Sequence, residues 1–172
     1  MRKAYIGVDI GVAGGLCAIG EDDKIIDCVV MPTMEIIVNK KKKNQYDLQA
    51  INLWIIKMTD TFQCCAIMER LRPMPSQMSQ TAFSLGYGTA IFETLFTVHG
   101  IKFEKIEARK WQQNMFTGFT YTKDQTKVIS IQVAKTMEPS YDWRATERCK
   151  VAHDGKTDSY LLSIYLRITC TK

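Results

Sequence analysis

The sequence has few histidines, no cysteine pair at metal-binding spacing and no long apolar run. Two histidines and six cysteines, none in a Cys-x-x-Cys pattern, argue against a structural zinc site. We expect the cysteines to be reduced and buried, as in proteins of a reducing compartment. Asp9 breaks the first apolar run, and no apolar run of roughly 18 residues follows, so the sequence predicts neither a signal peptide nor a membrane helix.

Length and composition indicate one globular domain spanning residues 1–172. The chain is 46% hydrophobic and 24% charged, which is ordinary for a folded domain of this size. Lys and Arg number 23 against 18 Asp and Glu, and the net charge of +5 says little by itself about a polyanionic partner. Residues 39–43 form a lysine-rich run, whose composition favours a solvated flexible loop over a nucleic-acid contact.

Apolar patterning predicts an α/β fold that opens with an antiparallel meander. The expected strands span residues 4–10, 16–19 and 24–31, with a turn at 21–23. A helix capped by Asp47 then precedes a buried strand at 64–68. A helix from Ser76, a strand at 102–106 and helices at 109–115, 123–137 and 155–168 follow. This order predicts a mixed five-stranded sheet, three antiparallel strands and then two more, flanked by helices.

Three of the expected helices carry an apolar side. The side residues are Leu48, Ile51, Ile55 and Met58 in the first helix; Phe83, Tyr87, Ile91, Leu95 and Val98 in the second; and Leu161, Ile164, Tyr165 and Ile168 in the last. Gly86 and Gly88 interrupt the second helix. They indicate either the close approach of another backbone or of a ligand, or a tolerated kink.

Four acidic residues lie where the predicted elements could bring them together. Asp9 lies inside the first strand, Glu69 closes the fourth, and Asp154 and Asp158 lie four apart on one face of the last helix. Taken singly, most have a simple structural interpretation: Asp154 and Asp158 stabilise a helix start, and Glu69 pairs with an arginine at position 70 or 72. Asp9 is the exception, because a carboxylate in a central strand is costly to bury unless it is paired or bound to a metal.

Convergence of these carboxylates would create a site for divalent cations. Neighbouring strands lie about 4.8 Å apart, so Asp9 and Glu69 can meet, and a helix packed across the sheet could add Asp154 and Asp158. Unpaired carboxylates repel one another, and hard oxygen ligands select Mg²⁺ or Mn²⁺. Two such ions are the usual arrangement for phosphodiester hydrolysis, in which one activates water and the other stabilises the leaving oxygen.

Several short segments, taken in order, resemble the motifs of one known superfamily. Residues 6–11 with Gly14 and Gly15 resemble its opening metal-binding motif, 67–69 its glutamate motif, and 85–88 a small-residue helix near the dimer and DNA surfaces. Residues 106–111 resemble the segment that leads into a DNA-contacting stretch, and Lys127, Ser130, Ala134 and Pro139 resemble the helix after it. Residues 153–154 and 158–159 resemble the C-terminal acidic motif. The sequence is thus similar to the ribonuclease H-like superfamily, specifically to RuvC-like Holliday junction resolvases.

The resemblance implies a Mg²⁺-dependent endodeoxyribonuclease with two ions per active site, in which Mn²⁺ can substitute. It makes Asp9, Glu69, Asp154 and Asp158 catalytic metal ligands, with His153 a candidate to replace or assist Asp154. The last two carboxylates are four residues apart here, whereas bacterial members commonly place them three apart, so Asp158 is the safer assignment. The resemblance also implies a homodimer whose two active sites nick a four-way DNA junction symmetrically.

Basic and aromatic side chains supply the expected DNA contacts. The candidates for the phosphate path are Arg70, Arg72, Lys110, Lys123 and Lys127, although any one of them has a solvated surface charge as its simpler interpretation. Phe116, Phe119 and Tyr121 either stack on unpaired bases at the junction or belong to the core.

Other functions fit parts of the same pattern. A ribonuclease H-like nuclease acting on RNA–DNA hybrids or flaps would use the same carboxylates, and a non-catalytic junction-binding protein would need none of them. The turn after Asp9 also resembles the phosphate-binding turn of actin-like kinases, but that fold requires a second, similar domain. We expect a cytoplasmic location, which means the host cell for a viral or phage protein, and an organelle is a further alternative.

Overall fold

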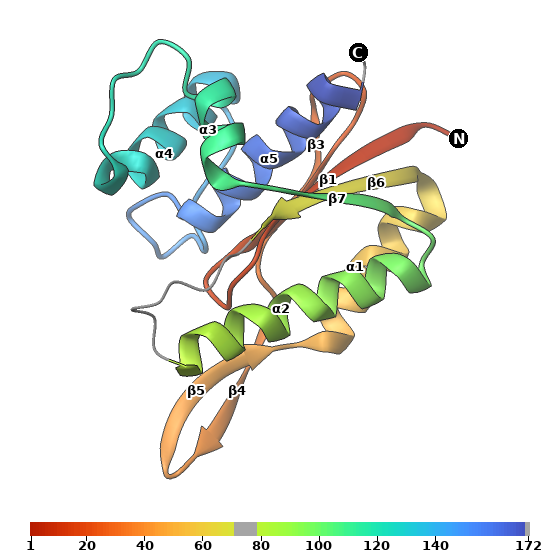
Figure 1. The fold of residues 1–172 in the computed structure, drawn as a ribbon, viewed down its shortest axis with the longest axis vertical. Coiled ribbons are helices and arrows are strands. Elements are labelled where there is room, and N and C mark those ends of the chain that lie inside the picture. The colour runs from red at the N-terminus through yellow and green to blue at the C-terminus, as the bar shows by residue number, and fades with distance from the viewer. Residues whose placement is uncertain (71–78, 171–172) are drawn as a thin grey trace.

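The computed structural model describes residues 1–70 and 79–170, without the side chains at positions 79, 80 and 123. Its centre is a five-stranded sheet in the order β3-β2-β1-β6-β7 (Figure 1). The strands are β1 (Lys3–Asp9), β2 (Gly15–Ile19), β3 (Ile25–Val30), β6 (Gln63–Glu69) and β7 (Lys102–Ile106). β2 is antiparallel to both β1 and β3, and β6 and β7 run parallel to β1. The predicted mixed sheet is therefore confirmed.

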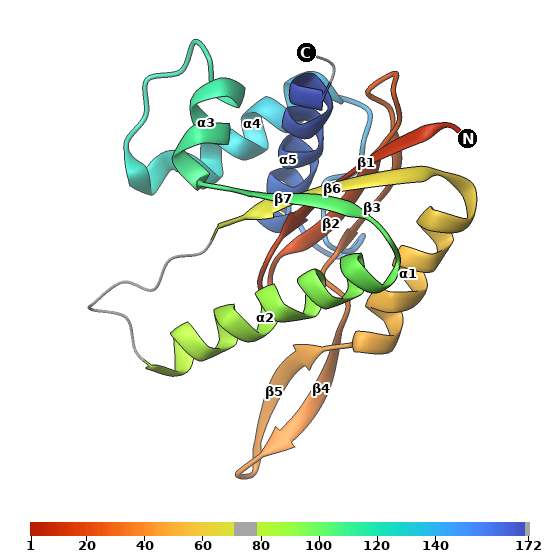
Figure 2. The same cartoon turned by 45° about the vertical axis from the view of Figure 1, so that its right-hand side comes forward.

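Helices cover both faces of this sheet (Figures 1 and 2). On one face lie α1 (Leu48–Thr61) and α2 (Ser79–Val98), and on the other lie α3 (Ala108–Met115), α4 (Thr126–Met137) and α5 (Asp154–Cys170), with a 3-10 turn at Lys123–Gln125 before α4. Because side chains alternate along a strand, neighbours on β1 serve different cores: Tyr5 packs with the α5 side and Ile6 with the α1 and α2 side. No helix in the described ranges is both long and apolar enough to cross a lipid bilayer.

The helix expected after Asp47 is present. The side-chain oxygen of Asp47 accepts a hydrogen bond from the backbone N–H of Ala50 at 2.9 Å, which satisfies one of the free donors at the helix start. Ile51, Ile55 and Met58 are buried as expected, because they lie on the side of α1 that faces the sheet. Leu48, in contrast, is 44% exposed.

The lysine-rich run is not a flexible loop. Its residues 41–43 form the first half of β5 (Lys41–Tyr46), which pairs with β4 (Thr33–Val38) in a separate two-stranded sheet. The hairpin turns at Asn39 and Lys40, whose φ angles of 51° and 62° are those of a two-residue turn with both central residues left-handed. The sequence pattern did not predict this hairpin, because lysine is uncommon in strands and β5 lacks an alternation of apolar and polar residues.

The apolar side predicted for α2 is only partly its buried side: Ile91 is buried and Leu95 packs against the core, but Tyr87 is 42% exposed. Phe92 and Phe96 are fully buried, whereas Phe83 and Val98 are 77% and 73% exposed. α2 carries apolar residues on more than one side, so spacing alone does not identify the side that faces the sheet. The expected start of this helix at Ser76 lies outside the described residues.

Smaller differences concern helix ends, glycines and cysteines. α5 begins at Asp154, one residue earlier than expected, and Ile168 near its end is 40% exposed instead of facing inward. In α2, a Cβ at Gly88 would lie 2.4 Å from the Tyr46 hydroxyl, so a side chain, not another backbone, approaches there. The six cysteines are free, but only Cys17 and Cys28 are buried, so the expectation of general burial is wrong.

Candidate active site: a carboxylate cluster at the strand ends

Asp9 and Glu69 end two neighbouring strands at the same edge of the sheet. Asp9 is the last residue of β1 and Glu69 the last residue of β6, and the residues before them, Val8 and Met68, are paired in the parallel register. Because parallel strands point the same way, their final side chains emerge at one edge. The structure thus brings together two carboxylates that are 60 residues apart in the sequence (69 − 9).

Helix α5 reaches this edge because glycines leave room for its backbone. A Cβ added to Gly7 in β1 would lie 2.0 Å from the carbonyl oxygen of Ser159, and a Cβ added to Gly155 would lie 2.4 Å from the carbonyl carbon of Gly14. No side chain fits in either space, so the start of α5 rests directly on the backbone of the sheet. This contact places Asp154 and Asp158 near the strand ends at which Asp9 and Glu69 lie.

The charge environment of Asp9 shows how close these groups are. Burial, followed by the negative charges of Asp158, Glu69 and Asp154 in that order, raises the pKa of Asp9 well above its usual value, and the positive charge of Lys127 only partly opposes this. No hydrogen-bond donor or cation of the described chain contacts the Asp9 carboxylate. Asp9 therefore lies in an environment that disfavours its negative charge.

Asp158 shares this environment but has a partner. The hydroxyl of Ser130 in α4 donates a short hydrogen bond to Oδ1 of Asp158 and also lies 3.1 Å from the Thr157 hydroxyl. Burial raises the pKa of Asp158 to about 7, the hydrogen bond from Ser130 opposes the rise, and the charges of Glu69 and Asp154 add to it. Asp158 thus titrates near neutral pH, where a proton and a divalent cation would compete for it.

Glu69 is held by Trp111. The indole Nε1 of this fully buried tryptophan in α3 donates a hydrogen bond to Oε1 of Glu69 at 2.7 Å. Burial raises the pKa of Glu69, and the hydrogen bond from Trp111 counteracts it. The expected pairing of Glu69 with Arg70 is not found, and Arg72 lies outside the described residues. Trp111 was not among the predicted site residues, although a tryptophan in an otherwise polar helix, with one N–H to satisfy, was a signal for such a partner.

Asp154 and His153 differ from the other three carboxylates in the direction of their pKa shifts. Asp154 forms an ion pair with Lys127 of 2.5 Å, and the hydrogen bond and charge of Lys127 outweigh burial and lower the pKa of Asp154. Burial lowers the pKa of His153, and Nδ1 accepts a long hydrogen bond of 3.4 Å from the backbone N–H of Lys156. Lys127, expected on the phosphate path, is thus engaged with a carboxylate.

The remaining predicted DNA-contact residues divide into two groups. Arg70, at the end of β6, and Lys110, on α3, are exposed, whereas the side chain of Lys123 and all of Arg72 lie outside the described structure. Among the aromatic candidates, Phe116 is 2% exposed and packs edge-on against the rings of Trp111 and Tyr121. It therefore belongs to the core. Phe119 and Tyr121 are partly buried against the same cluster.

Two solved structures with nearly the same extent share this architecture. One, titled as RuvC of Thermus thermophilus in complex with a Holliday junction substrate, is 8% identical, with 99% of this chain and 96% of that chain covered and a TM-score of 0.57. The other, a Thermus thermophilus RuvC structure, is 10% identical over the same shares of both chains, with a TM-score of 0.57. This chain has the RuvC-like fold. No family model and no curated protein matches its sequence.

The RuvC-like sheet presents a donor set that suits hard divalent cations. Asp9, Glu69, Asp154 and Asp158 offer only carboxylate oxygens, and burial together with the charges of the other three raises the pKa of Asp9. Within residues 1–70 and 79–170, no three His, Cys, Asp or Glu side chains lie close enough together to form a ready ligand set. Negatively charged carboxylates repel one another, and this repulsion opposes their close approach. Bound cations would remove it.

Proposed function

We propose that the protein is a divalent-metal-dependent endonuclease that resolves four-way DNA junctions. The observation that carries this proposal is the shared environment of Asp9, Glu69 and Asp158 at one edge of a RuvC-like sheet. A structural core has no use for three carboxylates whose pKa values burial raises, and among which the charges of Asp158 and Glu69 raise the pKa of Asp9 further, whereas a phosphodiester hydrolase needs such a group. The ribonuclease H-like fold supports a nuclease in general, and the choice of a branched DNA substrate follows the RuvC likeness.

In this proposal Asp9, Glu69 and Asp158 hold Mg²⁺, with Mn²⁺ as a substitute, and Asp154 contributes when it leaves Lys127. Bound in a pair, such ions stabilise charge on the attacking and leaving oxygens of a phosphodiester. The protein's own part is positioning: Trp111 fixes one oxygen of Glu69, and Ser130 fixes one oxygen of Asp158. The exposed Arg70 and Lys110 flank this edge and supply phosphate contacts.

A homodimer fits the two-fold symmetry of a junction, because two active sites can then cut two strands in a related way. The exposed aromatic side chains of α2 support this part of the proposal. Phe83 and Tyr87 are 77% and 42% exposed on the helix whose glycines resemble the dimer-side helix of the family. Sedimentation analysis of the wild-type protein and of Phe83→Ser would test it, because the dimer mass should fall only in the variant.

A cytoplasmic location, host or otherwise, remains a prediction. Its support is the cysteine content, since the six thiols are free, including the exposed Cys170.

The substrate test uses four matched nucleic acids. Purified protein is incubated with a four-way junction, a Y-fork, a linear duplex and an RNA–DNA hybrid, each with Mg²⁺ or EDTA. We expect paired symmetric nicks in the junction alone, only with the metal. Cutting of the hybrid in preference to the junction would assign the alternative nuclease activity, and tight junction binding without cutting in Mg²⁺ or Mn²⁺ would assign a non-catalytic role.

A further inference from the structure

The β4–β5 hairpin is a two-stranded ribbon that extends away from the main sheet. Figures 1 and 2 show it projecting beyond α2, with its turn at the far end. It is hydrogen-bonded to no strand of the five-stranded sheet, and residues 41–45 are all exposed. The ribbon therefore buries little surface of its own. Its exposed residues are not needed for packing and are available to bind a partner.

The charge of the ribbon is concentrated on one side. Residues opposite each other in the register share a face, so Lys41 and Lys43 lie on the face of Val38 and Ile36. Lys42 lies on the other face, where its Nζ is 2.9 Å from a carboxylate oxygen of Glu35. No acidic side chain in the described ranges pairs with Lys41 or Lys43, and Lys40 in the turn adds a third charge to theirs.

The base of the ribbon is fixed next to the carboxylate cluster. The backbone N–H of Met31, just before β4, donates to the carbonyl oxygen of Gly14 at 3.0 Å, beside the contact that seats α5. Tyr46, which ends β5, is 3% exposed. Burial and then the negative charge of Asp9 raise the pKa of Tyr46 to about 12, which places the tyrosine within electrostatic reach of Asp9.

The length of the ribbon matches a stretch of duplex leaving the site. Each strand has six residues, so the lysines stand up to about 20 Å from the base at roughly 3.3 Å per residue. That span corresponds to about six base pairs of B-form DNA at roughly 3.4 Å per pair. A two-stranded ribbon is also one of the shapes that the major groove of DNA admits.

We propose that the β4–β5 hairpin is an arm that binds the phosphate backbone of a duplex extending from the active site. The contact is carried by Lys40, Lys41 and Lys43, with Ile36 and Val38 as apolar neighbours opposite Lys43 and Lys41, and Met34 on the same face nearer the base. The inference rests on the proposed nuclease function and adds to it a place where one arm of the substrate lies. Lys42 contributes less, because Glu35 already neutralises it.

The arm predicts a specific change in salt dependence. Each lysine that neutralises a phosphate of duplex DNA contributes about 0.9 to the slope of log affinity against log salt concentration. Replacing Lys40, Lys41 and Lys43 by glutamine should reduce that slope by up to about 2.7 and weaken junction binding at low salt by tenfold or more. Cutting by the bound enzyme should be unchanged, because these residues do not touch the carboxylates.

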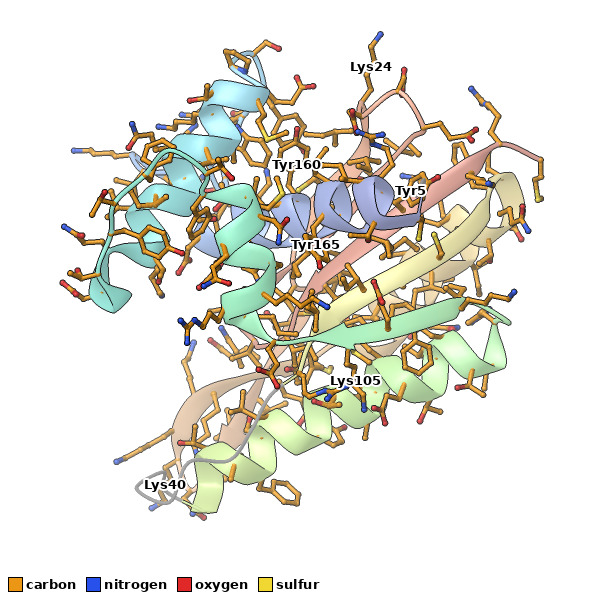
Figure 3. All side chains as sticks on the ribbon, turned by 45° about the horizontal axis from the view of Figure 1, so that its top comes forward. Tyr5, Lys24, Lys40, Lys105, Tyr160 and Tyr165 are labelled. Carbon is orange, nitrogen blue, oxygen red and sulfur yellow. The ribbon has the colours of Figure 1, made fainter. Side chains whose placement is uncertain are left out.

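A matched control removes the same charge elsewhere. Lys3, Lys24 and Lys102 are exposed, and Lys3 and Lys102 begin β1 and β7, at the end of these parallel strands opposite the cluster. Figure 3 shows Lys24 and Lys40 at opposite ends of the molecule. Fluorescence anisotropy with a junction of 20-base-pair arms, over a range of potassium chloride concentrations, would compare wild type, the arm variant and the control.

The proposal is supported if only the arm variant loses slope and affinity while its single-turnover cutting rate at saturation stays at the wild-type value. Equal slopes for the arm variant and wild type would overturn it, as would equal losses in the arm variant and the control. A change in sedimentation of the arm variant would overturn it in favour of a contact between copies of the chain. If the wild-type protein binds junctions but does not cut them, the nuclease proposal fails. The slopes of log affinity against log salt concentration would still show whether the β4–β5 hairpin binds DNA.

Discussion

The indole Nε1 of Trp111 lies 2.7 Å from Oε1 of Glu69 and donates a hydrogen bond to it. The tryptophan is fully buried in α3, whereas the glutamate ends β6, so the contact ties a helix on one face of the sheet to the edge where the carboxylates gather. A positioning role for Trp111 follows from this geometry. Groups that orient metal-binding carboxylates commonly affect activity almost as much as the ligands themselves.

Trp111→Phe keeps most of the buried ring but removes the donor. We expect junction cutting to fall by about 10- to 100-fold, with a higher Mg²⁺ concentration needed for half-maximal rate, because one oxygen of Glu69 loses its fixed position. The matched control is Trp143→Phe, whose indole N–H donates instead to the carbonyl oxygen of Glu138 at 3.2 Å. Equal loss of activity in both variants would show that Trp111 acts through stability alone.

Ser130 gives a second test through pH. The hydrogen bond from Ser130 lowers the pKa of Asp158, which burial otherwise raises, so Ser130→Ala should raise that pKa above its value of about 7. The rising limb of the pH–rate profile should therefore move to higher pH, with the rate at pH 9 largely retained. Thr136→Val on the exposed side of α4 should leave the profile in place. A profile for Ser130→Ala that keeps the wild-type midpoint would exclude Asp158 as the titrating group.

Stability without divalent ions should fall as pH rises from about 5 to 8. The folded-state pKa of Asp158 is about 7, above the ordinary 3.8 of an unfolded chain, so the native state holds a proton that the unfolded state has lost. Native-state stabilisation is thus present at low pH and is lost as pH passes through 7, and the raised pKa of Asp9 acts in the same direction. Melting temperatures in EDTA should drop by several degrees over this range.

Mg²⁺ should restore the melting temperature at pH 8, because binding to the ionised carboxylates stabilises the native state. Asp158→Asn serves as the comparison and should show a smaller pH dependence in EDTA. A wild-type protein whose melting temperature is the same at both pH values and insensitive to Mg²⁺ would contradict this electrostatic account.

The close contact of α5 with the sheet can be tested with added methyl groups. Gly155→Ala and Gly7→Ala should each destabilise the protein by at least about 1–3 kcal/mol, because the new Cβ meets backbone atoms that cannot move aside. Gly86→Ala is the control, since nothing lies within 4 Å of its Cβ position and alanine is the better helix former by about 1 kcal/mol. Denaturant unfolding measures all three. Wild-type stability in Gly155→Ala would show that α5 is not seated as described.

Patterns that repeat along the chain predicted the sheet, because each buried strand carries its own apolar signal. They also predicted that Asp9 and Glu69 lie on strands close enough for the two carboxylates to meet, although Asp9 was expected inside the first strand and is instead its last residue. The β4–β5 hairpin was missed, since its pairing depends on the turn at Asn39 and Lys40 and not on burial. The buried side of α2 was predicted only at Ile91 and Leu95, because only packing against the sheet distinguishes Phe92 and Phe96 from the exposed Phe83.

Sequence patterns could not identify the hydrogen-bond donors to the carboxylates, for a different reason. Trp111 and Ser130 are 42 and 28 residues away from Glu69 and Asp158, on helices whose position is set by the whole core. Spacing within one element cannot report contacts between elements, so these side chains could be placed in helices but not assigned to the site.

The most direct test of the central claim is cutting of a four-way junction by the wild type, Asp9→Asn and Asp158→Asn under single-turnover conditions with Mg²⁺. Each asparagine keeps the size of the side chain but removes a charge that would hold the cation. The account predicts paired nicks by the wild type, and variants that bind the junction at least as tightly but cut it more than a thousandfold more slowly, on the order of the 4 kcal/mol that metal-ion catalysis supplies. Wild-type cutting rates in either variant would contradict it.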